Sequence, residues 1–463
     1  MPRFTPEHLS SWTGGRWSAR PVSPLTGFHF DSRLLGAGDI FVAVRTALRD
    51  GHEFLAAAQA AGAGAALVSR PQAGLALPQL VVRDPLTAWH AIAREHRRAF
   101  RGPVVGISGS AGKTSTKDLL AVLLGGEAGG VIATAGNFNN HLGVPLTLTR
   151  LDPARHRFAV VEAGTSAPGE LQPLAAMIEP DVSLITLIAP AHTAALGGLV
   201  GVAAEKAALP AATRTSGVAI FSRATAEYPA FRDLGVRQLI VERAEVVRPA
   251  EPPKDRVYYS TTHRGDETAV ALAYGPPPPL AFTFRRVSDG MAENAALAIC
   301  AALWLGVPRA TIQARLHEWR PAPLRGEARW VDGRLLYIDC YNANPASMAD
   351  ALACFVDLAP PAAPRLYVLG GMEELGAAAA EHHCALGRAL RLRAEDRIFV
   401  IGTHAAAVVA GIGGATPQVQ IVETLEPVAT AVAGWGGAVF VKGSRRYALE
   451  QVFAGTVEEV AHA

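Results

Sequence analysis

GISGSAGKTSTKDLL, which runs from Gly106 to Leu120, places a glycine-rich turn between the signals of a strand and the signals of a helix. The apolar run VVGIS predicts a buried strand, and KTSTKDLLAVLL predicts a helix. Glycines in such a turn let backbone N–H groups approach anionic oxygens, and the helix N-terminus adds its partial positive charge. The stretch therefore predicts a phosphate-binding loop between a strand and a helix.

The residue types in this loop assign a contact to each position. Lys113 is expected to reach the outer phosphates of a nucleoside triphosphate, and the Thr114 hydroxyl is expected to ligate Mg²⁺. The general motif has a glycine six residues before the lysine, where this chain has Ile107, so the loop has the shorter form G-x-x-G-K-[ST]. The alternative is a turn with an exposed lysine that binds nothing. The predicted nucleotide-binding residues of the loop are Gly109, Ser110, Ala111, Gly112, Lys113, Thr114 and Ser115.

The composition is that of a large folded protein without a nucleic-acid partner. The chain has 463 residues, of which half are hydrophobic and 18% are charged. At roughly 100–200 residues per domain, this length predicts about three domains. Lys and Arg number 43 against 41 Asp and Glu, and this balance offers no basic stripe for a nucleic acid.

Cysteine spacing and the N-terminus point to the cytoplasm. The four cysteines form no C-x-x-C pair, so zinc and redox sites are not expected, and isolated cysteines suit a reducing compartment. The N-terminus lacks the apolar core of a secretory signal. Residues 182–204 carry no charge, but Pro190 and three glycines favour a strand, a loop and a helix start over a membrane span.

Apolar runs that alternate with helical stretches predict an α/β fold in three parts. Residues 1–98 contain a strand, a helix and a second strand, followed by a charged helix. Residues 99–320 carry strand-like runs that predict a mostly parallel sheet with helices on both faces. Residues 321–463 carry five more such runs, which predict a second doubly wound sheet. The five runs are RLLYIDCY, RLYVLGG, DRIFVIG, VQIVE and AVFVKGS.

Three polar residues beyond the loop are candidates for a metal site. Glu162 ends the run FAVVE, where a buried carboxylate is costly unless it is paired or bound to a metal. His192 follows the next predicted strand, and both are plausible partners for Mg²⁺ with waters completing the shell. The alternatives are a residue beside a helix N-cap for Glu162 and a plain loop histidine for His192. Lys206 lies among alanines on a helix, where a surface lysine is the simpler reading.

Several stretches together resemble the Mur ligase family, in order and over nearly the whole chain. The most specific are GNFNNHLGVPLTLTRL (136–151) and DCYNANPASM (339–348). The others are GISGSAGKTSTK (106–117), VVEAGTSAPGEL (160–171), PAH with EKAAL (190–209), LYVLGGMEELG (366–376), VFVKGSR (439–445), and DSRLLGAGDIFVAVRT with DGHEFLAAA (31–58).

The resemblance implies a three-domain, ATP-dependent carbon–nitrogen ligase of peptidoglycan and cell-wall synthesis. The domains would be a small α/β UDP-substrate-binding domain (1–98), a central P-loop ATPase (99–320) and a C-terminal Rossmann-like domain (321–463). The nearest branch activates a UDP-linked muramoyl tripeptide as an acyl phosphate and joins it to the dipeptide D-alanyl-D-alanine. Because ATP would be held by two domains, domain closure is expected.

The resemblance also implies roles for residues that match the family's motifs. The matching lysine is carbamylated, so Lys206 would become an anionic oxygen ligand for a second Mg²⁺ beside His192. Catalytic roles would fall to Lys113, Lys206 and His192, and metal ligation to Thr114, Glu162, His192 and Lys206. Further nucleotide contacts would be Asn294, Arg325, Asp339 and Asn342. Substrate contacts would be Ser32, Arg33, Asn137, Asn140, Thr165, Lys442, Ser444 and Arg445.

The chain departs from the family's motifs at several positions around these residues. Gly290 and Met291 replace a His-Asn pair, Leu187 replaces an asparagine, and Gly371 replaces an aspartate. The substrate wall reads EAGTSAPGE instead of EMGANHPGE, and TALRDGH also differs from the usual motif. Two alternatives therefore stand beside the cell-wall ligase. One is a diverged paralogue that joins another acid and amine, and the other is a catalytically silent nucleotide-binding protein.

Overall fold

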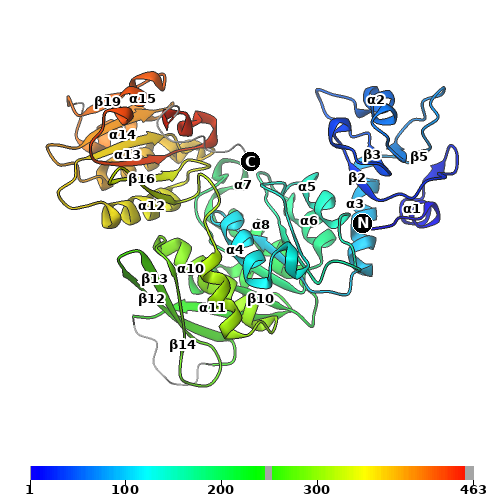
Figure 1. The fold of residues 1–463 in the computed structure, drawn as a ribbon, viewed down its shortest axis with the longest axis horizontal. Coiled ribbons are helices and arrows are strands. Elements are labelled where there is room, and N and C mark those ends of the chain that lie inside the picture. The colour runs from blue at the N-terminus through cyan, green and yellow to red at the C-terminus, as the bar shows by residue number, and fades with distance from the viewer. Residues whose placement is uncertain (1, 246–252, 415, 454–463) are drawn as a thin grey trace.

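Three β-sheets, each covered by helices, make up the computed structural model, which describes residues 2–245, 253–414 and 416–453 (Figure 1). The sheets are mostly parallel, so the predicted α/β class is confirmed. In Figure 1 the sheet nearest the N-terminus and the C-terminal sheet lie on either side of the central one. No helix in the described part of the chain is long and apolar enough to cross a membrane.

The N-terminal sheet has five strands in the order β1-β5-β4-β3-β2. Its inner strands are parallel, and only β1 runs antiparallel to its neighbour. The strands are β1 (Arg16–Trp17), β2 (Gly27–His29), β3 (Asp39–Val42), β4 (Ala65–Val68) and β5 (Gln79–Val81), and the helices are α1 (Pro6–Thr13) and α2 (Leu55–Ala60).

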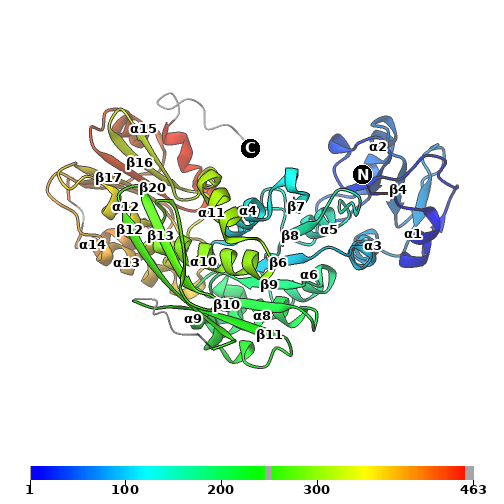
Figure 2. The ribbon, with the colours of Figure 1, turned by 60° about the horizontal axis from the view of Figure 1, so that its bottom comes forward.

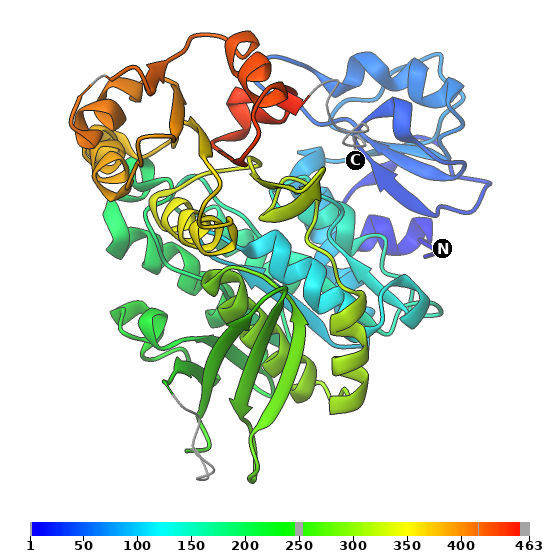
Figure 3. The ribbon, with the colours of Figure 1, turned by 60° about the vertical axis from the view of Figure 1, so that its left-hand side comes forward.

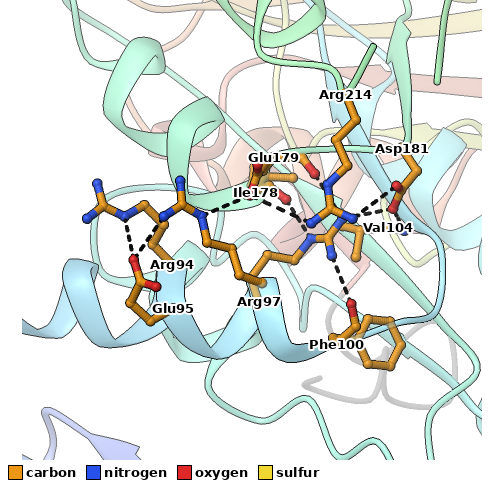
Figure 4. A network of polar contacts seen from close by, with 10 residues as sticks. Arg94, Glu95, Arg97, Phe100, Val104, Ile178, Glu179, Asp181 and Arg214 are labelled. Atoms are coloured by element: carbon orange, nitrogen blue, oxygen red, sulfur yellow. Dashed lines mark hydrogen bonds and ion pairs between the residues drawn. The ribbon is translucent and has the colours of Figure 1, made fainter. Parts of the chain in front are cut away.

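The long helix α3 (Pro85–Ala99) joins this sheet to the central one (Figure 4). Trp89 and Ile92 pack into the N-terminal core, whereas Ala93 packs into the central core. The guanidinium of Arg97 is fully buried and donates hydrogen bonds of 2.8 Å to Ile178 O, Glu179 O and Asp181 Oδ2. Asp181 Oδ2 also accepts from the backbone N–H that starts β6, so one ion pair holds the helix against the amino ends of two central strands.

The central sheet has nine strands in the order β14-β13-β12-β11-β10-β9-β6-β8-β7. The strands are β6 (Val104–Ser108), β7 (Val131–Ala133), β8 (Phe158–Glu162), β9 (Val182–Ile185), β10 (Val218–Ser222), β11 (Arg237–Arg243), β12 (Arg256–Arg264), β13 (Glu267–Ala273) and β14 (Leu280–Arg285). The part from β7 to β12 is parallel, as expected. The edge formed by β12, β13 and β14 is antiparallel, which the sequence analysis did not anticipate.

Helices cover both faces of this sheet, which gives it two separate cores. One face carries α4 (Lys113–Leu124), α10 (Asp289–Trp304) and α11 (Arg309–Glu318). The other carries α5 (Gly143–Leu148), α6 (Leu171–Ile178), α7 (Thr193–Leu196) and α8 (Gly198–Ala211), and the short α9 (Arg223–Ala226) follows β10. The strand–loop–helix unit predicted around Lys113 is confirmed as β6 and α4.

The C-terminal sheet has six strands in the order β15-β16-β20-β17-β18-β19. The strands are β15 (Glu327–Val331), β16 (Arg334–Asp339), β17 (Arg365–Gly370), β18 (Arg397–Ile401), β19 (Val419–Ile421) and β20 (Ala438–Lys442), and the helices are α12 (Pro345–Leu358), α13 (Ala379–Ala389), α14 (Ala405–Ile412) and α15 (Glu426–Ala433). The five predicted runs form the parallel strands, and β15 adds an antiparallel edge. The last residues of the predicted third domain, 454–463, lie outside the described residues.

The C-terminal sheet rests against the central unit on the side that carries α4 and α10 (Figures 2 and 3). Among the contacts that join the units, α10 meets α12, and α7 meets the short helical turn Gly376–Ala378. Because parallel strands end at one edge of a sheet, the loops after β6, β8 and β9 gather at this junction.

Candidate active site

A cavity of about 740 Å³ lies between the central and C-terminal sheets and is lined by both. It brings together residues that lie up to 332 positions apart in the sequence, from Ser110 to Lys442. The sequence-predicted residues that line it are Ser110, Ala111, Gly112, Lys113, Thr114, Ser115, Asn137, Asn140, Glu162, Thr165, His192, Asn294, Arg325, Asp339, Asn342 and Lys442.

The turn after β6 needs its glycines because the backbone passes close to two side chains. Gly109 has φ +143°, and a Cβ there would stand 2.0 Å from Thr186 Oγ1. Gly112 has φ +76°, and its Cβ would stand 2.3 Å from Asn294 Nδ2. The turn is also tied to the segment after β9, because Ser110 N donates to Leu187 O over 2.8 Å. These contacts hold the loop open at the N-terminus of α4, where an anion is stabilised.

Lys113 is the first residue of α4 and points its ammonium back along the loop. Its Nζ donates a hydrogen bond of 2.9 Å to Gly109 O. Burial lowers the pKa of Lys113, the carboxylate of Glu162 opposes that shift, and the charge of Arg325 adds to it. The positive charge of Lys113 is therefore only partly balanced by its neighbours, which suits it to a polyanionic ligand.

Glu162 ends β8 with a carboxylate that is only half satisfied. The residue is 1% exposed, and Oε1 accepts a hydrogen bond of 2.7 Å from Asn139 Nδ2. Among the described residues, no group hydrogen-bonds the buried Oε2. A helix-cap role for Glu162 is wrong, because the next helix begins at Leu171 with Glu170 as its N-cap. An unpaired buried carboxylate oxygen at a cavity wall is the arrangement expected of a cation ligand.

Asn139 lines the cavity but was not among the predicted site residues. The signal for it was its place between Asn137 and Asn140, which were predicted. Asn140 turns out to serve the chain locally, since its Oδ1 accepts from the backbone N–H groups of Leu142 and Gly143 over 3.0 Å.

His192 stands at the start of α7 with φ +54°, in the left-handed region. Its Nδ1 contacts Glu374 Oε2, which belongs to the loop after β17 in the C-terminal unit. Burial lowers the pKa of His192, and the carboxylate of Glu374 opposes the shift. His192 thus lies in a loop and also lines the cavity. Glu374 is a second residue that the sequence analysis missed.

Lys206 is 2% exposed on α8, so the reading as a surface lysine is wrong. It does not line the cavity, but its amine lies within electrostatic reach of Lys113, Glu205, Glu170 and Glu162. Burial, and secondarily the charge of Lys113, lowers the pKa of Lys206 to about 7. A lysine with this pKa is substantially uncharged at neutral pH, which is unusual and typical of functional lysines.

The donor set around Glu162 fits a hard, partly hydrated cation better than a closed metal cage. In residues 2–245, 253–414 and 416–453, no group of three or more His, Cys, Asp and Glu side chains is placed to hold a metal. Mg²⁺ is bound in proteins through one or two carboxylates, several waters and the phosphates of its substrate. Glu162, with one unpaired carboxylate oxygen, and Thr114, with a hydroxyl, line the same cavity and meet that need, so the residues present fit Mg²⁺.

The C-terminal unit contributes cations and amides to the opposite wall. The guanidinium of Arg325 lies 3.8 Å from the centre of the Tyr341 ring, which holds it over the cavity. Lys442 Nζ forms an ion pair of 2.5 Å with Asp339 Oδ2 and donates to Asn342 O over 3.3 Å. This wall therefore faces the phosphate loop with ordered polar groups.

Four of the predicted substrate contacts lie away from the cavity. Ser32 and Arg33 form part of a short helical turn in the N-terminal unit, where Arg33 pairs with Asp31 at the surface. Ser444 N donates to Gly371 O over 3.1 Å, and Arg445 pairs with Glu450. Their contacts with a substrate stay predictions.

The structure gives a local reason for one departure from the family's motifs. Gly290 N donates a hydrogen bond of 2.8 Å to Asp350 Oδ1 of the C-terminal unit, and a Cβ at Gly290 would lie 2.7 Å from Asp350 Oδ2. A larger residue there would push the two units apart, so glycine allows this contact. The side chain of Leu187, which replaces an asparagine, lines the cavity while its carbonyl holds Ser110.

Known family models, relatives and solved structures resemble this chain over most of its length. Residues 107–302 match the family model described as Mur ligase middle domain, and residues 325–445 match Mur ligase, glutamate ligase domain. The UDP-N-acetylmuramoyl-tripeptide–D-alanyl-D-alanine ligase of Escherichia coli strain K12 is 31% identical over 436 residues, which cover 91% of each chain. The protein of the same name from Synechocystis is 32% identical over 394 residues, 84% of this chain and 82% of that protein. A crystal structure of MurF from Acinetobacter baumannii covers 98% of both chains with a TM-score of 0.86 at 26% identity.

Proposed function

Because this chain belongs to the Mur ligase family, we propose that it is an ATP-dependent ligase that joins D-alanyl-D-alanine to UDP-N-acetylmuramoyl-tripeptide in peptidoglycan synthesis. The single observation that carries the proposal is the cavity, in which the phosphate loop faces Arg325, Asp339 and Asn342. The relatives that bear this name align with nearly the whole chain, which favours this substrate pair over a different acid and amine.

In this reaction the γ-phosphoryl group of ATP moves to the carboxylate of the tripeptide, which gives ADP and an acyl phosphate. The amine of D-alanyl-D-alanine attacks the acyl carbon, and inorganic phosphate leaves from the tetrahedral intermediate. The protein has little covalent chemistry to perform, so its contribution is positioning and charge neutralisation. Backbone N–H groups of residues 111–114 would bind the phosphates, and Lys113 would offset the charge that moves with the γ-phosphoryl group.

Glu162 and Thr114, with His192 nearby, would hold Mg²⁺ beside those phosphates. A bound Mg²⁺ would supply further charge neutralisation on the transferring group. Asn139 holds Oε1 of the Glu162 carboxylate and leaves Oε2 without a hydrogen-bond partner, so Oε2 would be the oxygen available to the metal. On the C-terminal side, Arg325 and Asn342 would contact the nucleotide, so both units would have to be docked for turnover.

Lys206 is the residue whose role depends most on its surroundings. We propose that its amine reacts with CO₂ to form a carbamate, which turns a buried cation into an anionic oxygen ligand for a second Mg²⁺. Only the uncharged amine reacts, and a pKa of about 7 makes that form abundant at neutral pH. The positive charge of Lys113 would also favour the resulting negative charge.

The cysteines and the substrates together indicate the compartment in which the protein works. All four cysteines are unpaired thiols, as expected in a reducing environment such as the cytoplasm. ATP and the UDP-linked precursor are also found there, so we propose that the reaction takes place in the cytoplasm.

A phosphate-release assay tests the proposed activity. UDP-N-acetylmuramoyl-tripeptide with D-alanyl-D-alanine should support turnover that requires both substrates and ATP. Turnover only with other acid–amine pairs would assign the chain to a diverged branch, and ATP binding without turnover on any pair would make it a silent binding protein. Lys113→Ala should abolish ADP formation. Lys206→Ala should be partly rescued by short carboxylates, and loss of both this rescue and bicarbonate dependence would rule out the carbamate.

A further inference from the structure

His192 and Glu374 meet across the junction between the central and C-terminal units. His192 begins α7 of the central unit, and Glu374 lies in the loop that follows β17. The ring Nδ1 of His192 contacts Glu374 Oε2. The other ring nitrogen, Nε2, takes no part in this ion pair. The contact therefore selects which nitrogen of His192 remains available to the cavity.

A carboxylate on one ring nitrogen is the usual partner of a histidine that binds a metal through the other. The acceptor holds the proton on Nδ1, leaves the Nε2 lone pair free, fixes the ring orientation and raises the basicity of the ligand nitrogen. Here the carboxylate comes from a different unit than the histidine. The free nitrogen is on a residue that lines the same cavity as Thr114 and Glu162.

The loop that carries Glu374 is anchored independently of this contact. Met372 N donates a hydrogen bond of 3.0 Å to His383 Nε2, and the neighbouring Glu373 accepts from Tyr447 Oη. Both contacts lie within the C-terminal unit, so the loop is held in place and Glu374 is left to face the central unit. Next to it, Thr193 Oγ1 donates to Leu375 O over 3.2 Å, which seats the loop on the start of α7.

Both residues of the pair have a backbone conformation that residues other than glycine rarely adopt. His192 has φ +54° and Glu374 has φ +63°, and they are two of the six non-glycine residues with positive φ in the described part of the chain. Such conformations persist only where the surrounding structure requires them, and they concentrate at functional sites. Since 60% of the Glu374 side chain is exposed, the ion pair adds little to stability.

We propose that Glu374 is a positioning residue for His192, supplied by the C-terminal unit, which sets the imidazole for metal–nucleotide binding only when the two units are docked. This inference rests on the proposed function in that it assigns His192 to the Mg²⁺ of a bound nucleotide. It adds a physical link between closure and metal affinity. The nucleotide contacts from Arg325 and the orientation of His192 would then arrive together.

Metal affinity measured without turnover tests the inference. Mn²⁺ is titrated, with electron paramagnetic resonance as the readout, into the full-length protein saturated with a non-hydrolysable ATP analogue. Glu374→Ala should weaken Mn²⁺ binding about 10-fold or more, as loss of such a partner does elsewhere. Glu374→Gln should retain most of the affinity, because an amide oxygen in the same place can still contact Nδ1. The matched control is Glu381→Gln, which removes an exposed carboxylate from α13 of the same unit and should leave the affinity unchanged.

A double-mutant cycle separates positioning from a general effect on the loop. In a His192→Ala background, Glu374→Ala should cause no further loss of Mn²⁺ affinity, since the residue through which it acts is gone. ¹⁵N spectra of histidine-labelled protein, with His192 assigned from the spectrum of His192→Gln, should show the Nδ1–H tautomer in the wild type and its loss in Glu374→Ala.

Several results would overturn the inference. These are wild-type Mn²⁺ affinity in Glu374→Ala, an equal loss in Glu381→Gln, additive losses in the cycle, or a wild type that binds no Mn²⁺ with the analogue. Failure of the proposed function looks different. A wild type that ignores the tripeptide and the dipeptide but shows the expected Mn²⁺ affinities would change the substrate assignment and leave the role of Glu374 standing.

Discussion

Asn139 Nδ2 donates a hydrogen bond of 2.7 Å to Oε1 of Glu162, and Oε2 of the same carboxylate is buried without a partner. Glu162 is therefore not a satisfied core acid. It is a negative group held at one oxygen by the protein and left open at the other, at the end of β8 and in the wall of the main cavity.

Asn139→Ala should both destabilise the protein and weaken magnesium–nucleotide binding. It removes the remaining side-chain donor from a buried carboxylate, a change that costs about 1–3 kcal/mol of unfolding free energy. Urea denaturation measures this loss, and titration with Mg²⁺ and a fluorescent ATP analogue measures the binding. Asn137→Ala is the stability control, because Asn137 is exposed in the same loop. Equal unfolding free energies for the two variants would contradict the role given to Asn139.

Gly112→Ala should abolish ATP binding while the protein remains folded. The new Cβ would stand 2.3 Å from Asn294 Nδ2, so the loop would have to move away from the N-terminus of α4. Gly62→Ala is the matched control, since Gly62 has a similar positive φ of +87° but no atom within 4 Å of the added carbon. Circular dichroism checks the fold, and titration with a fluorescent ATP analogue checks the loop. A Gly112→Ala variant that binds the analogue like Gly62→Ala would show that close packing of the loop is unimportant.

Lys442→Met should destabilise the C-terminal unit strongly. Lys442 is 1% exposed, and its loss would leave the partly buried Asp339 carboxylate without its cation, which costs about 3–5 kcal/mol. The double variant Lys442→Met, Asp339→Asn should recover much of that loss. Arg445→Ala removes a half-exposed partner of Glu450 three residues later and should cost no more than about 1 kcal/mol. Urea denaturation of the four proteins provides the comparison, and a Lys442 effect as small as that of Arg445 would be inconsistent with a buried pair.

Lys206→Met should stabilise the protein at pH 7, and the gain should shrink as the pH rises toward 10. In the folded state the pKa of Lys206 is about 7, against an ordinary value of 10.5 in the unfolded chain. Between these values the unfolded chain binds more protons, so the penalty for burying Lys206 falls as the pH rises through the window. Unfolding free energies at pH 7, 8, 9 and 10 in CO₂-free buffer, for this variant and for Lys254→Met at the surface, measure the effect. A difference from wild type that does not change with pH would contradict the low pKa.

Local features of the fold were predictable because they depend on neighbours in the sequence. The apolar run before Gly109 and the helix formers after Gly112 each specify their own element, and α4 spans the predicted residues Lys113–Leu124. The same holds for the five parallel strands of the C-terminal sheet. The antiparallel edge at β12 and β13 was not anticipated, because which strand pairs with which depends on contacts made after the chain has turned back.

The features of the site can be separated in the same way into those that the sequence predicts and those that depend on the tertiary structure. From the sequence alone came the phosphate loop, the candidate ligands Glu162 and His192, and the order of the three parts. Only the tertiary structure decided that Lys206 is buried, that Asn139 takes one oxygen of Glu162, and that Glu374 reaches His192 from the other unit. The reason is physical: helix and strand formation respond to residues a few positions away, whereas burial, partner choice and pKa respond to whatever the folded chain brings alongside.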